Sequence, residues 1–599
     1  MPLRDTIICS SCVLLAVLFI VVAGMHLDSI NRQRQDMNLI MDTPENLPPT
    51  LAFATIATGA FRGLVVDILW IRADKLKEEG QFFDARQLAE LITVLQPRFA
   101  AVWEFHAWNM AYNISVAIPA SEPEQRWQWV KNGYELLRDE AIDKYKLENL
   151  LIYRELGRIF QHKIGGITDD AHKYYKLQLA FALEPLLEYS DNTPVDNEYF
   201  DKLVEAPKSW EQIASDPNML TFINALKSAD NVFKKDDDFI TNYLSLRQNS
   251  NRFEPEAGRA IDEFRGTETL EKFDIFTKSY QLRNKWKLEP EFMREMNQVY
   301  GPVSNWNDPN SRLPLDWRHP DVHAIYWIVK GLKIQAQNES GEIDIHQTNT
   351  DRMVAHSLQN LFRYGKIFIY EEPVEIESED ISQESRIDIL YNIYYRPDTR
   401  MFLSYNESLH AILEKYEDSE DKSSLESFQV GHRNMLINAL LQFYQSRQIA
   451  EAQEIYNEIK ERYQDANADI TLAEFARNRL LEELDSMDIF DSQEQIIALM
   501  YDSYYLYAMG DDEIALGRER MAEQVYNHYR ETYSNEQRIA LPEINMLKYR
   551  ALVDFMFDEQ FRQYYREILL KRIMLERPEL YEKLKAEGLK YSEELEEQQ

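Results

Sequence analysis

Several long stretches of the chain repeat apolar residues three and four positions apart, which is the spacing of one face of an α-helix. Residues 321–334, 351–365 and 493–509 are examples, with large aliphatic and aromatic side chains between charged ones. Gly and Pro are scarce, with 18 and 21 among 599 residues. Because all-β chains draw on those residues for their many turns, the pattern predicts an all-α protein with short connections.

The first apolar run, residues 7–25 (IICSSCVLLAVLFIVVAGM), carries no charge and is long enough to cross a bilayer as a helix. We predict an uncleaved, single-pass transmembrane anchor there. A signal peptide has the same layout, and residues 22–24 offer it a weak cleavage site, but the length of the run favours the anchor. Arg4 precedes the run and two arginines follow it, which leaves the orientation open. We expect the bulk of the chain outside the cytoplasm.

A second apolar stretch, residues 51–71, contains Arg62 and Asp67 near its middle. Each charge would cost about 2.5–3.5 kcal/mol at the centre of a bilayer. We therefore assign the stretch to a buried helix of the body, in which Asp67 is a buried acid bonded to a neighbouring element. A proline-rich break, residues 42–50 (DTPENLPPT), separates the anchor from this body.

Parts of the chain match the spacing of a 34-residue helix–turn–helix repeat. Small residues at fixed positions would let two helices approach closely, and large residues would fill the space between successive pairs. Pro97 cannot continue a helix and would end the second one. The positions that carry the match are Leu69, Ala73, Gly80, Ala85, Pro97, Trp103, Ala107, Tyr153, Leu156, Gly157, Phe160, Ala452 and Tyr456.

This spacing resembles the tetratricopeptide repeat (TPR). The beginning of the first match, residues 59–76 (GAFRGLVVDILWIRADKL), is also similar to that of uncharacterised bacterial membrane-anchored TPR proteins. The resemblance implies a TPR-like α-solenoid of stacked helix pairs, and it implies no activity. Insertions interrupt the pattern between residues 118 and 127 and around Gly165 and Gly166.

The middle of the chain departs from the repeat and holds polar loops and an acidic run, residues 371–380 (EEPVEIESED), which we expect to be a solvated loop. The expected organisation is an N-terminal tail (1–6), the transmembrane anchor (7–25), a linker (26–50), an N-terminal TPR-like array (51–190), an irregular, mostly helical middle (191–430), a C-terminal TPR-like array (431–585) and an acidic tail (586–599).

The chain is strongly acidic, with 102 Asp and Glu against 66 Lys and Arg and a net charge of −36. Binding to nucleic acid or to anionic lipid needs an excess of basic side chains, so we exclude nucleic acid as a partner. The two cysteines, Cys9 and Cys12, both lie in the predicted anchor. The body therefore has no disulfide, no thiolate metal site and no cysteine nucleophile.

We find no phosphate-binding glycine loop, zinc-protease motif, nucleophile elbow or haem-attachment motif, and we expect no catalytic site, cofactor or metal. The most suggestive cluster is in residues 313–327, where Asp316, His319, Asp321 and His323 could hold a divalent metal. The alternative is structural and we favour it: a proline at position 320 begins a helix well, which puts His319 at its cap.

All ten tryptophans lie between Trp70 and Trp327. This concentration admits two interpretations. Aromatic side chains could line a groove for a sugar or a peptide. We interpret most of them as core residues of the helix pairs.

Three functions remain open. The leading one is a membrane-anchored scaffold or adaptor that binds protein partners. The second is an extracytoplasmic binder of a glycan or peptide, since the chain resembles TPR-based glycan-binding lipoproteins of some bacterial envelopes but lacks their lipid-modified cysteine. A helical enzyme built around residues 313–327 ranks last.

Overall fold

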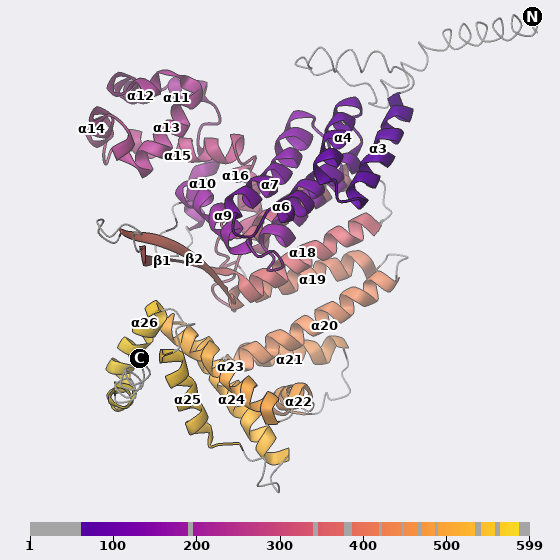
Figure 1. The fold of residues 1–599 in the computed structure, drawn as a ribbon, viewed down its shortest axis with the longest axis vertical. Helices are drawn as coiled ribbons and strands as arrows, with labels where there is room; N and C mark the ends of the chain where they lie inside the picture. Colours follow the sequence, from indigo (N-terminus) through magenta and orange to yellow (C-terminus); the bar gives the residue numbers. More distant parts are fainter. Residues whose placement is uncertain are drawn as a thin grey trace, which may run out of the picture. The chain divides into compact units, whose positions relative to one another are not determined.

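The computed structural model describes residues 62–187, 189, 196–308, 310–338, 345–376, 386–417, 422–445, 448–463, 470–484, 489–532, 541–557 and 563–585. The predicted anchor, linker and acidic tail lie outside these residues. No helix of the described residues is both long and apolar enough to span a membrane. Apart from one β-hairpin and an isolated bridge, the regular structure of the described residues is helical, which confirms the predicted all-α class (Figure 1).

Two compact units divide the chain between Val102 and Trp103. In the first unit, α3 (Arg62–Glu78) packs against α4 (Phe82–Leu95), and the two are joined by a tight turn. Gly80 occupies that turn with φ +76°, a left-handed conformation that favours glycine. Among the predicted repeat positions, Ala73 and Ala85 are fully buried and Leu69 is half-buried, whereas Pro97 follows the end of α4.

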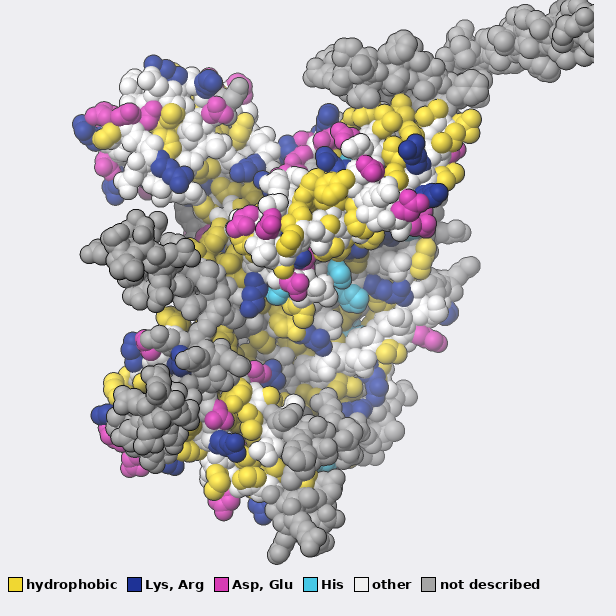
Figure 2. Space-filling model, viewed as in Figure 1, with side chains coloured by type: hydrophobic (Ala, Val, Ile, Leu, Met, Phe, Trp, Pro, Cys, Tyr) yellow, Lys and Arg dark blue, Asp and Glu magenta, His cyan; other side chains and the backbone are white. Residues whose placement is uncertain are grey.

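The expectation that Asp67 is a buried acid is wrong, because its side chain is exposed on α3. Leu64, Ile68 and Ile71 are exposed too, by 59%, 58% and 69%. Their spacing places them on one side of the helix, and Figure 2 shows apolar side chains gathered there. An ionised carboxylate avoids the cost of desolvation at such a hydrated position.

The second unit begins with long helices, three of which run on into π-helical turns. The buried side chains here include Trp103, Ala107, Leu156 and Phe160, four of the predicted repeat positions. The elements are α5 (Ala100–Trp108, which begins in the first unit), η2 (Asn109–Ile114), α6 (Ser115–Ala117), α7 (Pro123–Glu135), η3 (Leu136–Lys144), α8 (Leu150–Arg158), η4 (Ile159–Ile164) and α9 (His172–Leu187).

A cluster of shorter helices follows, with its own core rich in phenylalanine. The ring of Phe273 contacts the rings of Phe222 and Phe239 edge to face, an arrangement that aromatic pairs prefer. The elements are α10 (Asn197–Glu205), α11 (Trp210–Ala214), α12 (Pro217–Ala229), η5 (Asn231–Lys234), α13 (Asp236–Gln248), η6 (Ser250–Arg252), α14 (Pro255–Glu263), α15 (Glu268–Asn284) and α16 (Pro290–Tyr300).

The most deeply buried helix of this unit is α17 (Pro320–Asn338), since every residue from 317 to 329 is buried. It packs against α8 and against α18 (Ile345–Tyr364). Glycines on both helices allow the contact with α8. A Cβ on Gly157 of α8 would lie 2.5 Å from Ile328 Cγ1, and a Cβ on Gly331 of α17 would lie 2.5 Å from Tyr153 Cβ.

A β-hairpin follows α18, with β1 (Lys366–Ile376) antiparallel to β2 (Arg386–Arg396). The base of the hairpin packs on α9, where Ile367 and Ile393 form a small core with Ala180. The first part of the acidic run, expected to be a loop, lies in β1, and the rest lies outside the described residues. The expectation is wrong there because β-branched and aromatic residues precede the run and fill the opposite strand.

The remaining helices are long, and they pack in pairs such as α20 with α21 and α23 with α24. Ala452 and Tyr456, the last two predicted repeat positions, are buried in α21. The elements are η7 (Thr399–Met401), α19 (Phe402–Glu417), α20 (Lys422–Gln445), α21 (Ile449–Tyr463), α22 (Leu472–Leu484), α23 (Ile489–Ala508), α24 (Asp512–Thr532), α25 (Ile544–Phe557) and α26 (Gln563–Glu576).

We expect Gly331→Ala to loosen the contact between α8 and α17, because the new methyl group overlaps the Cβ of Tyr153. Overpacking of this kind costs about 1–3 kcal/mol. Amide hydrogen exchange in both helices should therefore accelerate about tenfold, as measured by mass spectrometry. The control is Gly258→Ala in α14, where a Cβ meets nothing within 4 Å and exchange should stay the same or slow. Equal exchange in both variants would contradict the prediction.

Candidate functional site

The cluster predicted around residues 313–327 forms the N-terminal end of α17 and the segment before it. As expected, Pro320 is the first helical residue and His319 lies just outside the helix. The His319 Nε2–H donates to the carbonyl of Tyr364 at 3.0 Å, and Nδ1 accepts from the amide of Asp321 at 3.1 Å. The Nε2 bond holds the beginning of α17 against the end of α18, and the Nδ1 bond caps the first turn of α17 itself.

The side chain of His323 contacts other residues than that of His319 does. Its Nε2–H donates to the carbonyl of Trp317 at 2.8 Å, and its ring stacks on Phe160 of η4 with centroids 4.9 Å apart. Burial lowers the pKa of both His319 and His323 to about 4, so both rings are neutral at pH 7.

Asp316, the third predicted ligand, pairs with the guanidinium of Arg318. Its two oxygens lie 3.0 and 2.8 Å from the Nε and an Nη of that residue. The four predicted ligand side chains therefore do not converge on one point, and each bonds to other protein groups. Trp317 and Trp327 are buried in the core around them. They and two others, Trp103 and Trp286, are the four buried tryptophans, whereas the other six are half-buried, so the core interpretation holds fully for four of the ten.

A cavity of about 330 Å³ lies beside His319 and Asp321. Its walls come from five places in the chain: the Gly165–Gly166 connection, α9, the beginning of α17, the end of α18 and the base of β2. The exposed side chain of Ile167 lies at this cavity. Its volume falls at the low end of the range for small-molecule pockets.

Two lysines of α9 line this cavity: Lys173 is exposed, whereas Lys176 is buried, with only 5% of its surface exposed. Its Nζ donates to His172 Nδ1 at 3.2 Å and lies 4.9 Å from the centre of the Tyr395 ring. No carboxylate of the described residues lies within ion-pair distance of it. Burial lowers the pKa of Lys176 to about 8, against the opposing effect of the Asp321 charge.

Asp321 is the acid of the same cavity, with 1% of its surface exposed. Burial raises its pKa to about 7, against hydrogen bonds from Asn360 and Ser357 that lower it. The amide of Asn360 donates to its Oδ1 at 3.0 Å. A Cβ on Gly165 would lie 3.3 Å from Oδ2, so glycine at that position leaves room for the carboxyl group.

A buried ion cluster fixes the connection that forms one wall of this cavity. Asp169 accepts from Lys163 at 2.5 Å, from Arg126 at 3.0 Å and from the amide of Ala171 at 2.9 Å. Two cations thus share one buried carboxylate, which leaves a local excess of positive charge. The chain between η4 and α9 is held at both ends by this cluster.

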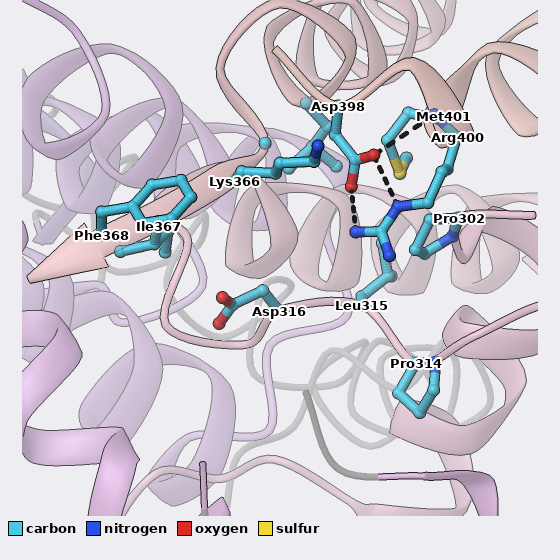
Figure 3. Close-up of a pocket in the computed structure, with 12 residues that line it drawn as sticks. Pro302, Pro314, Leu315, Asp316, Lys366, Ile367, Phe368, Asp398, Arg400 and Met401 are labelled. Carbon is cyan, nitrogen blue, oxygen red and sulfur yellow. Dashed lines mark hydrogen bonds and ion pairs between the residues drawn. The ribbon is translucent and has the colours of Figure 1, made fainter. Parts of the chain in front are cut away.

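A second cavity, of about 340 Å³, is lined by the segment before α17, the end of α18, the base of β1 and η7 (Figure 3). Asp398 faces Arg400 there, with its oxygens 2.8 Å from both Nε and an Nη, while Asp316 lies apart from this pair. Because both carboxylates of this cavity are paired with arginines, the cavity around Lys176 is the stronger candidate for a site.

Sequence reasoning identified His319 and Asp321 but missed Lys176 and Asn360, which lie on other helices. The only sequence signal near the missed residues was the Gly165–Gly166 interruption of the repeat pattern.

The pKa of Asp321 gives stability a pH dependence of definite sign. Folding raises this pKa from 3.8 to about 7, so the folded state holds the proton more tightly and stability falls as pH rises between these values. Asp321→Asn cannot ionise, and it should gain roughly 2 kcal/mol over the wild type between pH 5 and pH 8. Melting temperatures across this range test this, with the exposed Asp170→Asn as control. Parallel curves for wild type and Asp321→Asn would refute it.

Comparison of the chain with protein-family models, with curated proteins and with solved structures gives no match in any of the three.

Proposed function

We propose that the chain is a membrane-anchored, TPR-like scaffold or adaptor that binds protein partners at a bacterial membrane. We further propose that the cavity beside α17 receives an acidic group of a partner. The observation that carries this proposal is the buried ammonium of Lys176, which faces a cavity and has no carboxylate of the described residues to neutralise it.

The helical architecture supports the scaffold. Helix pairs such as α3 with α4, α20 with α21 and α23 with α24 are units of the kind that stack into solenoids. Solenoids present extended surfaces to peptide segments and helices of other proteins. The predicted anchor at residues 7–25 would hold such a surface at the membrane, with the body on the extracytoplasmic side.

The chemistry of the cavity supports an acidic ligand group. A buried charge without a counter-ion is unfavourable, and a carboxylate that enters the cavity would relieve that cost at Lys176. Asp321 would oppose the ligand while ionised, but its pKa of about 7 lets it take up a proton and donate a hydrogen bond instead. The cavity volume suits one side chain or the carboxyl end of a peptide, and a larger ligand would extend outside it.

A second candidate is the extracytoplasmic binding of a free small ligand, such as a glycan or peptide. The tyrosines at positions 364 and 395 line the cavity, and its size lies within the range of small-molecule pockets. A free ligand would saturate the cavity without any protein partner.

The test is a cross-linked pull-down of the full-length protein from native membranes, read by mass spectrometry. The variant Lys176→Met keeps the length of the buried side chain and removes its charge. We expect it to lower the recovery of specific partners by roughly tenfold, because the loss of one charge-assisted hydrogen bond weakens binding by about that factor. The control is Lys202→Met, which removes an exposed lysine that pairs with Glu198 on the helix surface.

Equal recovery in both variants would refute the role of the cavity, and recovery of the protein without partners would refute the scaffold. In that case, a rise in melting temperature with added glycans or peptides, lost in Lys176→Met, would favour the second candidate.

A further inference from the structure

Three potential metal ligands from three consecutive helices meet in the second unit. They are His410 on α19, His432 on α20 and Glu458 on α21. One ligand atom from each lies within 4.8 Å of the others. Among the described residues, this is the one place where three or more His, Cys, Asp or Glu side chains come close enough to hold a metal ion. No pattern in the sequence indicated it, because the three residues belong to separate helices.

We propose that His410, His432 and Glu458 bind a divalent first-row transition metal, with Zn²⁺ as the preferred ion, and that the metal ties α19, α20 and α21 together. This proposal is independent of the proposed scaffold function. Two imidazoles and one carboxylate form a ligand set that suits zinc and its neighbours, whereas Mg²⁺ and Ca²⁺ prefer oxygen ligands alone.

The distances are close to those of a tetrahedral site. His410 Nε2 lies 2.6 Å from Glu458 Oε1, and His432 Nε2 lies 3.6 Å from the same oxygen. Ligand atoms around tetrahedral zinc lie about 3.4 Å apart, given bonds of about 2.0–2.2 Å. Small side-chain rotations would therefore open the space that the ion needs. Asn406 Oδ1, 2.7 Å from His432 Nε2, or a water molecule can supply the fourth ligand.

The second ring nitrogen of His432 has the partner that a metal ligand needs. Its Nδ1 lies 2.6 Å from the Tyr463 hydroxyl. A metal-binding histidine donates its other N–H to an acceptor, which fixes the ring and raises its basicity. The hydroxyl can accept that proton when Nε2 binds the metal, and it can donate to Nδ1 when Nε2–H bonds to Asn406 instead. The surroundings therefore fit the site both with and without the ion.

The protonation states also suit metal binding. Burial lowers the pKa of His432 to about 4, so the ring is neutral and its lone pair is free of a proton at pH 7. Burial alone would raise the pKa of Glu458, but hydrogen bonds from His410 and Asn406 hold it below its ordinary value. The set therefore offers a neutral imidazole from His432 and an anion from Glu458. The side chains of His410 and Glu458 are 32% and 26% exposed, which leaves a path from solvent for the ion.

The experiment uses the full-length protein with Cys9→Ser and Cys12→Ser, so that the thiols near the N-terminus cannot bind the ion. After treatment with a chelator and addition of Zn²⁺, gel filtration and elemental analysis should give one zinc per chain. The melting temperature should rise with added Zn²⁺. Co²⁺ in place of Zn²⁺ should give the visible absorption of a tetrahedral site.

The variants Glu458→Gln and His410→Asn should each lose the bound zinc and the rise in melting temperature. Both keep a side chain that can form hydrogen bonds, and circular dichroism checks that they fold. The control His346→Asn removes an exposed histidine of α18 and should bind zinc as the parent does. Tyr463→Phe should keep one zinc per chain with an affinity about 10–100-fold lower, as expected for loss of a ligand's supporting partner.

The absence of stoichiometric zinc in the parent would overturn the proposal. Retention of the zinc in folded Glu458→Gln and His410→Asn would overturn it as well, since the ion would then lie elsewhere.

Discussion

The close approach of α8 and α17 is the contact on which the rest of the second unit depends. It requires Gly157 on one helix and Gly331 on the other, because a methyl group at either position would overlap the facing side chain. The approach buries the first half of α17, residues 320–329, on all sides, and the beginning of the helix can then bind α18 through His319. The beginning of α17 forms one wall of the cavity beside α9, through His319 and Asp321.

Burial has opposite effects on the charged groups around that cavity, and the differences follow from their partners. Asp169 is ionised because two cations and an amide bond to it. Asp321 accepts a hydrogen bond from Asn360 but pairs with no Lys or Arg of the described residues, so burial raises its pKa instead. Lys176 has a histidine and an aromatic ring as neighbours, and its pKa falls. The same fold thus creates one cluster whose carboxylate is fully paired and, next to it, the pair of Asp321 and Lys176, whose pKa values are about 7 and about 8.

Local patterns in the sequence predicted local structure well. The turn at Gly80, the end of α4 before Pro97 and the beginning of α17 at Pro320 all follow from residues close to one another in the chain. The cavity and the three-helix cluster around His432 could not be predicted, because their members come from helices that meet only through tertiary packing. The β-hairpin was missed because its charged residues conceal the alternation of β-branched and aromatic ones. The exposure of Asp67 depends on which side of α3 faces solvent, and a single apolar stretch does not determine that.

The position of α17 along the chain has a consequence for the order of folding. Its partner α8 lies before the whole phenylalanine-rich cluster of α11 to α15, so their pairing closes a long loop, and the entropy lost grows with the effective length of that loop. If the cluster folds first, it shortens the loop that remains to be closed. Until the loop closes, the first half of α17 exposes the apolar side chains that the folded unit buries. We therefore expect this helix to be the segment of the nascent chain that chaperones protect for longest.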